Sequence, residues 1–155
     1  MGIANDQGNI GDLEQPLAEL LPEYFRKGLD PLKWAITLKH LLTMTAGFQP
    51  VRVEDRSRMS AWKFAEDQVQ YALDLPMIDK PGEKFAYSNS ISHILSVIIE
   101  TKAKTDLLTF ARQNLFLPLG IAPKLWREDA LGHTTGHGGL YLNTRQMAKI
   151  GFLFL

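Results

Sequence analysis

The most constraining feature of the sequence is an apolar stripe in its second half. Five residues recur at spacings of three and four and so fall on one face of a helix: Ile91, Ile94, Leu95, Ile98 and Ile99. This pattern predicts an amphipathic helix, the strongest element of the chain. Ser88 or Ser90 is expected to cap its N-terminus, because a serine hydroxyl can accept a bond from a free backbone N–H of the first turn.

The other predicted elements are shorter and are punctuated by Pro and Gly. They are an apolar turn at Leu17–Leu21, a helix over Leu38–Met44 capped by Thr37 and ended by Gly47, a helix capped by Ser60 and running through Trp62 to Leu73, a helix over Asp106–Leu115, a short strand over Gly139–Leu142 and a final helix capped by Thr144. Strand signals are scarce. We therefore expect a mainly α structure with short β pieces, not a complete α/β domain.

Composition excludes several kinds of site. The chain has no Cys, so it has no disulfide, no thiolate nucleophile and no Cys-ligated zinc. Its 17 Lys and Arg balance 17 Asp and Glu. Because no basic stripe with interleaved aromatics is present, we expect no nucleic-acid partner.

The two ends of the chain carry separate expectations. Met1–Ile10 lacks the apolar core of a signal peptide, and no stretch reaches the length of a membrane span. Ile150–Leu155 is apolar and has no stop signal after it, although an apolar surface needs a partner layer. We therefore expect residues 1–155 to be one truncated domain, and the compartment stays unknown.

Tyr87-Ser88-Asn89 lies between the Pro81-Gly82 turn and the N-terminus of the strongest helix. This position places polar side chains beside free backbone N–H groups, which is typical of a catalytic loop. Tyr87 would accept a proton if a nearby Lys lowered its pKa, and Asn89 would bond a substrate amide. From these three residues alone, a turn followed by a helix cap is the favoured interpretation.

Four longer segments add weight to the catalytic interpretation. Ile36–Phe48, Pro81–Asn89, Phe116–Ile121 and Gly138–Gly151 each resemble a segment of the serine β-lactamase-like family, and they occur in the family's order. That family includes class C β-lactamases, D-alanyl-D-alanine carboxypeptidases, other penicillin-binding-protein-like enzymes and esterases. Pro81–Asn89 resembles its Tyr-x-Asn motif, and Asn9–Leu13 is similar to the segment that follows its nucleophile helix.

The resemblance implies a serine hydrolase that acts through an acyl-enzyme on an ester, a β-lactam or a peptide amide. Tyr87 would be the general acid/base, and Asn89 would contact the substrate and the catalytic Lys. No metal or other cofactor is implied, and the partner of the intact enzyme would be a small ester or amide substrate. Intact relatives are often exported or periplasmic.

The chain departs from the family at two motifs. The family's Ser-x-x-Lys lies just upstream of a segment like Asn9–Leu13, and its third motif, Lys-Thr-Gly or His-x-Gly, lies on a late strand. Neither is present at its expected place. We therefore expect the helical subdomain of the β-lactamase/transpeptidase-like α+β fold, without most of the sheet and inactive as it stands.

Two lookalikes leave a compressed site open. Ser60-Ala61-Trp62-Lys63 fits Ser-x-x-Lys, and His133–Gly136 is close to the third motif. However, only 27 residues separate Ser60 from Tyr87 (87 − 60), far fewer than in the family. The favoured interpretation is an N-cap at Ser60 with Lys63 solvated.

A zinc site is also weighed at His133 and His137, with Glu128 and Asp129 nearby. Four glycines in this segment argue against the helix that would bring the two histidines together. We therefore expect a Gly-rich loop without metal. His40 and His93 are isolated and expected to be packing or surface residues, and Trp34, Trp62 and Trp126 are expected to be core or groove anchors.

One alternative function remains. The chain would be a stand-alone helical binding or assembly module derived from the same fold, and it would self-associate through Phe152–Leu155.

Overall fold

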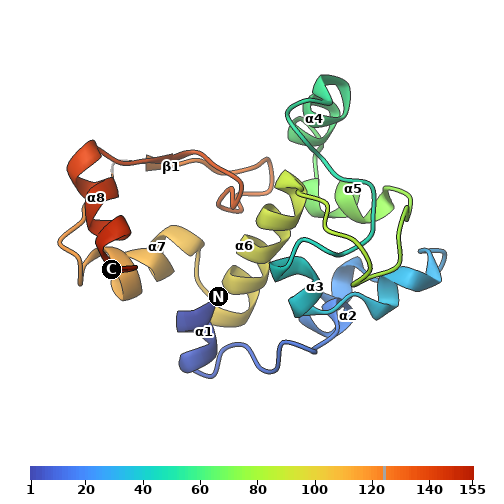
Figure 1. Cartoon of the computed structure of the whole chain (residues 1–155), viewed down its shortest axis with the longest axis horizontal. Coiled ribbons are helices and arrows are strands. Elements are labelled where there is room, and N and C mark those ends of the chain that lie inside the picture. Colours follow the sequence, from blue (N-terminus) through green and yellow to red (C-terminus); the bar gives the residue numbers. More distant parts are fainter. Residues whose placement is uncertain (124) are drawn as a thin grey trace.

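The computed structural model describes residues 1–123 and 125–155, and its longest element is α6 (Asn89–Ala103). In Figure 1, α6 lies in the middle, with α2 to α5 on one side, the later elements on the other, and α1 beside its lower end. The earlier elements are α1 (Gly2–Asp6), α2 (Leu17–Leu20), the 3₁₀ turns η1 (Pro22–Tyr24) and η2 (Pro31–Ala35), α3 (Leu38–Leu42), α4 (Arg56–Lys63) and α5 (Gln68–Asp74). The later ones are α7 (Leu107–Ala111), the π-helical turn η3 (Arg112–Phe116), β1 (Leu125–Trp126), β2 (Leu140–Tyr141) and α8 (Thr144–Phe152).

The two strands form the β structure of the described residues. They are antiparallel and pair Leu125 with Tyr141 and Trp126 with Leu140. The expectation of a mainly α structure with short β pieces is confirmed, and so is the short strand predicted within Gly139–Leu142.

The apolar stripe of α6 lies at the centre of the larger core. Ile91, Ile94 and Ile98 are buried, and the side chains of α2, α3 and α5 pack around them. The most deeply buried of these neighbours are Leu17, Leu20, Leu38, Leu41, Ala72 and Leu73. Fully burying one such side chain contributes roughly 1.5–3 kcal/mol, so this stripe accounts for much of what holds α6 in place.

The helix predicted from Ser60 to Leu73 is two helices, and Ser60 is not a cap. The Asp55 carboxylate accepts the N–H of Arg58 and begins α4, and the Asp67 carboxylate accepts the N–H of Gln70 and begins α5. Ser60 therefore lies exposed inside α4. The chain turns between the helices because the Trp62 indole N–H donates to the Gln68 carbonyl, 2.9 Å away, and buries the ring.

The caps of three other helices are settled by side-chain contacts. Thr37 caps α3 as predicted, and His40 completes a capping box with it. The final helix is capped by Asn143 instead of Thr144, because Asn143 Oδ1 accepts the Gln146 N–H. Gln146 Oε1 in turn accepts the Asn143 N–H, which completes a capping box. Ser88 precedes α6, but its hydroxyl accepts the Val51 N–H. Neither Ser88 nor Ser90 therefore makes the predicted cap bond.

A smaller apolar cluster lies on the side of α7 and α8. Ala111, Phe116 and Ile121 are buried in it, and Ile150 of α8 packs at its edge. None of the α8 residues is buried, and Phe152, Leu153, Phe154 and Leu155 are all more than half exposed. Among the described residues, no helix is both long enough and apolar enough to span a bilayer.

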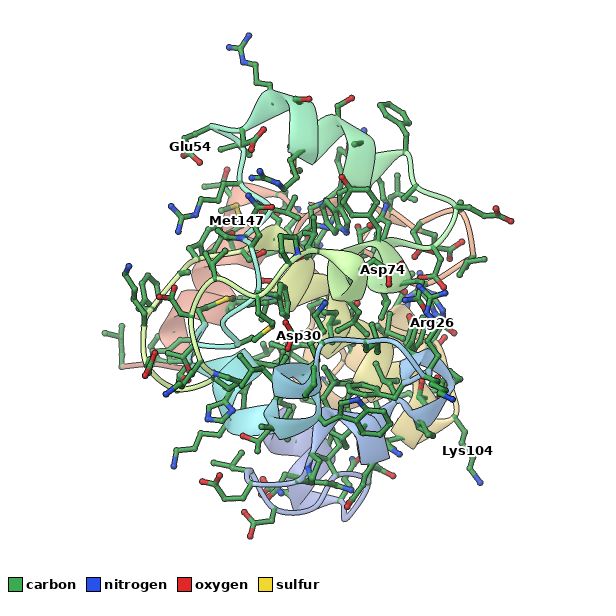
Figure 2. All side chains as sticks on the ribbon, turned by 90° about the vertical axis from the view of Figure 1, so that its right-hand side faces the viewer. Arg26, Asp30, Glu54, Asp74, Lys104 and Met147 are labelled. Carbon is green, nitrogen blue, oxygen red and sulfur yellow. The ribbon has the colours of Figure 1, made fainter. Side chains whose placement is uncertain are left out.

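A surface ion pair links the segment after η1 to the end of α5. Arg26 Nη2 lies 2.7 Å and 2.8 Å from the two carboxylate oxygens of Asp74, and both side chains are labelled in Figure 2. The pair is solvent-exposed, so it contributes at most about 1 kcal/mol.

The loop between β1 and β2 lies close against α6 at Gly136. A Cβ at this position would overlap the Ser92 carbonyl oxygen of α6, whereas a Cβ at Gly138, two residues later, would meet no atom within 4 Å. Neither glycine has a positive φ. The requirement for glycine at 136 is therefore one of space.

We predict that Gly136→Ala lowers the free energy of unfolding by about 2–3 kcal/mol, because the methyl group forces the loop away from α6. Gly138→Ala is the matched control and should change it by less than about 0.5 kcal/mol. Urea unfolding of both variants and the parent measures the difference. Equal stabilities for the two variants would show that the loop does not pack on α6 as described.

Candidate functional site

Tyr87 and Asn89 meet at the N-terminus of α6. The Tyr87 hydroxyl donates to Asn89 Oδ1 at 3.2 Å. The Tyr87 side chain is about half exposed (47%), while Asn89 is buried (6%). An exposed phenol thus lies against a fixed amide, the arrangement in which a hydroxyl is oriented for proton transfer to a bound molecule.

The backbone of Val51 holds this pair in place. Its N–H donates to Ser88 Oγ at 2.9 Å, and its carbonyl accepts both the Asn89 backbone N–H at 2.9 Å and Asn89 Nδ2 at 3.2 Å. The Asn89 amide therefore has a fixed orientation, with Oδ1 toward Tyr87. This orientation follows from the partners, since the opposite one would place two oxygens together at Val51.

An open groove of about 820 Å³ lies next to this segment. Arg52 lines it and donates from Nε to the Tyr87 carbonyl at 3.0 Å. Its other lining residues come from the segment before α4 and from α4 itself, with Pro50 and Ile78. The groove provides room for a ligand beside the loop that carries Tyr87.

Ser60 and Lys63 are both exposed on α4. Among the described residues, neither side chain makes a hydrogen bond or an ion pair with the other or with Tyr87. The residue of α4 that does approach Asn89 is Met59, whose Sδ lies 3.9 Å from Asn89 Nδ2.

A second group of polar residues lies on the same face of α6 as Asn89. His93 is fully buried, and its Nε2 lies 2.9 Å from Asp129 Oδ2. Because an ionised carboxylate only accepts, His93 Nε2 carries the proton. Burial acts to raise the pKa of Asp129, but the bonds from His93 and from the His133 N–H outweigh it and hold that pKa below its usual value.

The next turns of α6 continue this polar face. Ser96 Oγ donates to the Thr134 carbonyl at 2.7 Å. Glu100 accepts the Thr134 N–H at 3.0 Å and the Leu107 N–H at 2.9 Å on Oε1, and its Oε2 lies 2.8 Å from His133 Nδ1. The loop before β2 is thus bonded to α6 over about two turns, from His93 to Glu100.

These contacts give each of these histidines a different partner. The Gly132–Gly139 segment is a loop, as predicted, and His133 and His137 have different neighbours: His133 pairs with Glu100, and His137 packs on Trp62 with ring centroids 4.7 Å apart. No group of three or more His, Asp or Glu side chains in the part of the chain described here is arranged to hold a metal ion. His93, predicted to be an isolated residue, has instead a buried carboxylate partner.

Sequence reasoning missed the partners Asp129 and Glu100 because they lie 36 and 33 residues from the histidines they bond. A signal for them was nonetheless present. Asn89, His93, Ser96 and Glu100 recur at spacings of four, three and four, which places four polar residues on one face of the helix, opposite the apolar stripe. Such a face needs bonded partners if it is buried.

Comparison of the chain with known families finds one that matches nearly its whole length. The model of the family described as Beta-lactamase matches residues 4–154. Among curated proteins, the acyltransferase calJ of Penicillium decumbens is 25% identical over 134 residues, which cover 76% of this chain and 32% of that protein.

Solved structures show the same fold at low sequence identity. The octameric penicillin-binding protein homologue from Pyrococcus abyssi superposes with a TM-score of 0.72 at 20% identity, over 98% of this chain and 41% of that one. The β-lactamase/D-alanine carboxypeptidase from Yersinia pestis superposes with a TM-score of 0.67 at 23% identity, over 98% and 48%. The chain thus has the helical portion of the β-lactamase/transpeptidase-like fold, and it spans less than half the length of these relatives.

The environment of His137 makes the stability of the protein depend on pH. Burial, with the nearby His93 and Lys63, lowers the pKa of His137 to about 4. Between pH 6.5 and pH 4, His137 of the unfolded chain, with a pKa near 6.5, therefore binds a proton that His137 of the folded chain does not bind. The contribution of neutral His137 is complete above pH 6.5 and declines as the pH falls through this window.

We predict that the parent loses about 1–2 kcal/mol more stability than His137→Gln between pH 7 and pH 4, after allowance for solvent screening of this half-buried ring. Urea unfolding at a series of pH values measures both proteins, and the variant is the control for all other titrating groups. Parallel pH profiles for the two would contradict the prediction.

Proposed function

Because the chain belongs to the Beta-lactamase family, we propose that it carries the second catalytic motif of a serine hydrolase. In this proposal Tyr87 is the general acid/base, and Asn89 contacts the substrate and orients the Tyr87 hydroxyl. The observation that carries the proposal is the 3.2 Å hydrogen bond from the exposed Tyr87 hydroxyl to the fixed Asn89 amide.

The reaction proposed for the whole enzyme is acyl transfer from an ester, a β-lactam or a peptide amide to a serine. The serine oxygen attacks the carbonyl carbon and Tyr87 passes the serine proton to the leaving group, which departs when the carbonyl–heteroatom bond breaks. Water then cleaves the acyl-serine ester. Relatives described as an acyltransferase and as a D-alanine carboxypeptidase support acyl transfer as the reaction class.

We further propose that residues 1–155 alone do not turn over a substrate. The only Ser-x-x-Lys in these residues is Ser60–Lys63. Its two side chains are exposed on α4 and lack bonds to Tyr87 or Asn89 among the described residues. A nucleophile without an adjacent base, and without donors for the developing oxyanion, has no means of forming an acyl-enzyme at a useful rate.

We predict that the chain shows no turnover of nitrocefin or p-nitrophenyl acetate above background and is not labelled by a fluorescent penicillin. Absorbance assays and gel fluorescence with intact mass spectrometry measure the two properties. Stoichiometric labelling that disappears in Ser60→Ala would establish the compressed site, and turnover lost in Tyr87→Phe would refute inactivity.

The proposed catalytic role of Tyr87 is tested in the longer protein that the genomic reading frame encodes. If the frame extends upstream through a Ser-x-x-Lys, the longer protein should lose about 10²–10³-fold in kcat on Tyr87→Phe, the usual scale for removing a general acid/base. Phe64→Tyr, a change on the exposed surface of the Trp62 turn, is the control. An unchanged kcat in Tyr87→Phe would remove Tyr87 from the mechanism.

A second candidate function is a stand-alone helical assembly module. The exposed apolar end of α8 favours it, because Phe152–Leu155 presents four large apolar side chains to solvent. In this proposal the segment is buried against the same segment of a second copy.

We predict a concentration-dependent dimer in sedimentation velocity that Phe152→Glu with Phe154→Glu weakens at least tenfold, because charges replace the apolar contact. Met147→Glu, a change at an exposed residue of α8, is the control. A monomer at all concentrations would exclude the assembly module and leave the hydrolase proposal untouched.

A further inference from the structure

A half-enclosed cavity of about 320 Å³ lies where the end of α4 meets the loop between β1 and β2. Lys63 and Gln68 line it from the helical side. The loop contributes Asp129, Thr135 and His137, with Gly138 and Gly139, and Arg127 and Glu128 lie at the adjoining end of β1. Neither Tyr87 nor Asn89 lines it, so this cavity is separate from the proposed catalytic motif.

The buried wall of the cavity has a free hydrogen-bond acceptor. Gln68 is 4% exposed. Its Nε2 donates to the Lys63 carbonyl at 3.1 Å, which fixes the orientation of the amide, and Oε1 has no partner among the described residues. A buried amide oxygen without a donor is unfavourable, so this atom favours a ligand that brings an N–H or O–H group.

Two other polar side chains of the cavity, Asp129 and Thr135, are already bonded within the protein. Asp129 Oδ2 bonds His93, and Asp129 Oδ1 accepts the backbone N–H groups of Leu131 and His133 at 3.0 Å and 2.8 Å. Thr135 Oγ1 donates within the loop, to the Gly138 carbonyl at 2.7 Å. His137 is neutral at pH 7, and its buried Nδ1 has no partner in the described part of the chain.

The charged groups that remain are at the rim. Lys63 and Arg127 are exposed, and neither forms an ion pair within the described residues. Arg127 donates to the Tyr141 hydroxyl at 2.6 Å and lies over its ring, so its guanidinium is held in place with other N–H groups to spare. Glu128 supplies one negative charge, which leaves the rim with two cations and one anion.

We propose that this cavity is a binding site for a small carboxylate that also carries an amine or hydroxyl donor, such as an α-amino acid. The carboxylate lies between Lys63 and Arg127, and the donor reaches Gln68 Oε1. An ammonium group gains further from the Glu128 charge. The cavity volume fits a molecule of this size and excludes a folded partner.

The indole N–H groups of the three tryptophans report on ligand binding, because two lie beside the cavity and one lies away from it. The Trp62 indole N–H bonds the Gln68 carbonyl, and its ring contacts His137. The Trp126 indole N–H bonds the carbonyls of Thr135 and Gly138. Trp34 instead packs against Phe25, with ring centroids 5.1 Å apart, and neither of these residues lines the cavity.

The experiment is a titration of the ¹⁵N-labelled full chain with D-alanine and with L-alanine, followed by the three indole N–H signals. We expect the Trp62 and Trp126 signals to shift saturably for at least one enantiomer, with a Kd of about 1 mM for so small a ligand, while the Trp34 signal stays fixed. Acetate, which lacks the donor, and ethanolamine, which lacks the carboxylate, should each bind at least about tenfold more weakly.

Two variants test the placement of the ligand. Gly138→Val projects a side chain into open space at a backbone conformation that valine accepts, and it should weaken alanine binding more than about tenfold. Lys63→Met removes one carboxylate contact from the exposed rim and should weaken it about fivefold. Gly151→Val on α8, also in open space but outside the cavity, is the matched control and should leave the Kd unchanged.

Several results would overturn the proposal. They are the absence of a saturable shift with both enantiomers up to about 20 mM, equal shifts at Trp34, binding of acetate or ethanolamine as tight as that of alanine, and an unchanged Kd in folded Gly138→Val. An unchanged Kd in Lys63→Met would overturn the placement of the carboxylate.

Discussion

One polar face of α6 determines how the other elements are arranged around it. Buried polar groups must be hydrogen-bonded, and Asn89, His93, Ser96 and Glu100 lie buried along a single face of the helix. Their partners are the Val51 backbone, Asp129, and the Thr134–His133 segment. The opposite, apolar face holds α6 in the core, and the polar face selects which loops lie against it. Removing one member of such a pair leaves the other buried without a partner, at a cost of several kcal/mol.

The same face connects the two sites. Asn89 is in the first turn of α6, where it orients the Tyr87 hydroxyl, and His93 is one turn further, where its bond to Asp129 fixes the loop that carries His137. Trp62 of α4 fills the space between them, in edge contact with both His93 and His137. The loop beside the His137 cavity is therefore held by the same helix whose first turn carries Asn89 of the proposed catalytic motif.

Much of the fold was predictable because periodicity and capping are local. The α6 stripe, the Thr37 cap, the loop at Gly132–Gly139 and the β2 strand all follow from residues within a few positions of one another. The incorrect caps have different causes. Asp55 begins α4 five residues before Ser60, so Ser60 falls inside the helix. Asn143 takes the Gln146 N–H in place of its neighbour Thr144, and the Ser88 hydroxyl accepts the Val51 N–H instead of one from α6. Spacing rules identify where a cap is needed, but they do not decide which of several nearby candidates provides it.

The sequence by itself determined that the chain is mainly helical, that Tyr87 and Asn89 stand before a strong helix, and that thiol chemistry is excluded. These conclusions depend on residue types and short spacings. Only the tertiary structure decided that His93 pairs with Asp129 and His133 with Glu100, that Lys63 lies at a cavity, and that Gln68 Oε1 lacks a donor there. Each of these depends on segments tens of residues apart that meet only because the core brings them together, and side-chain partners across such distances leave no periodic signal in the chain.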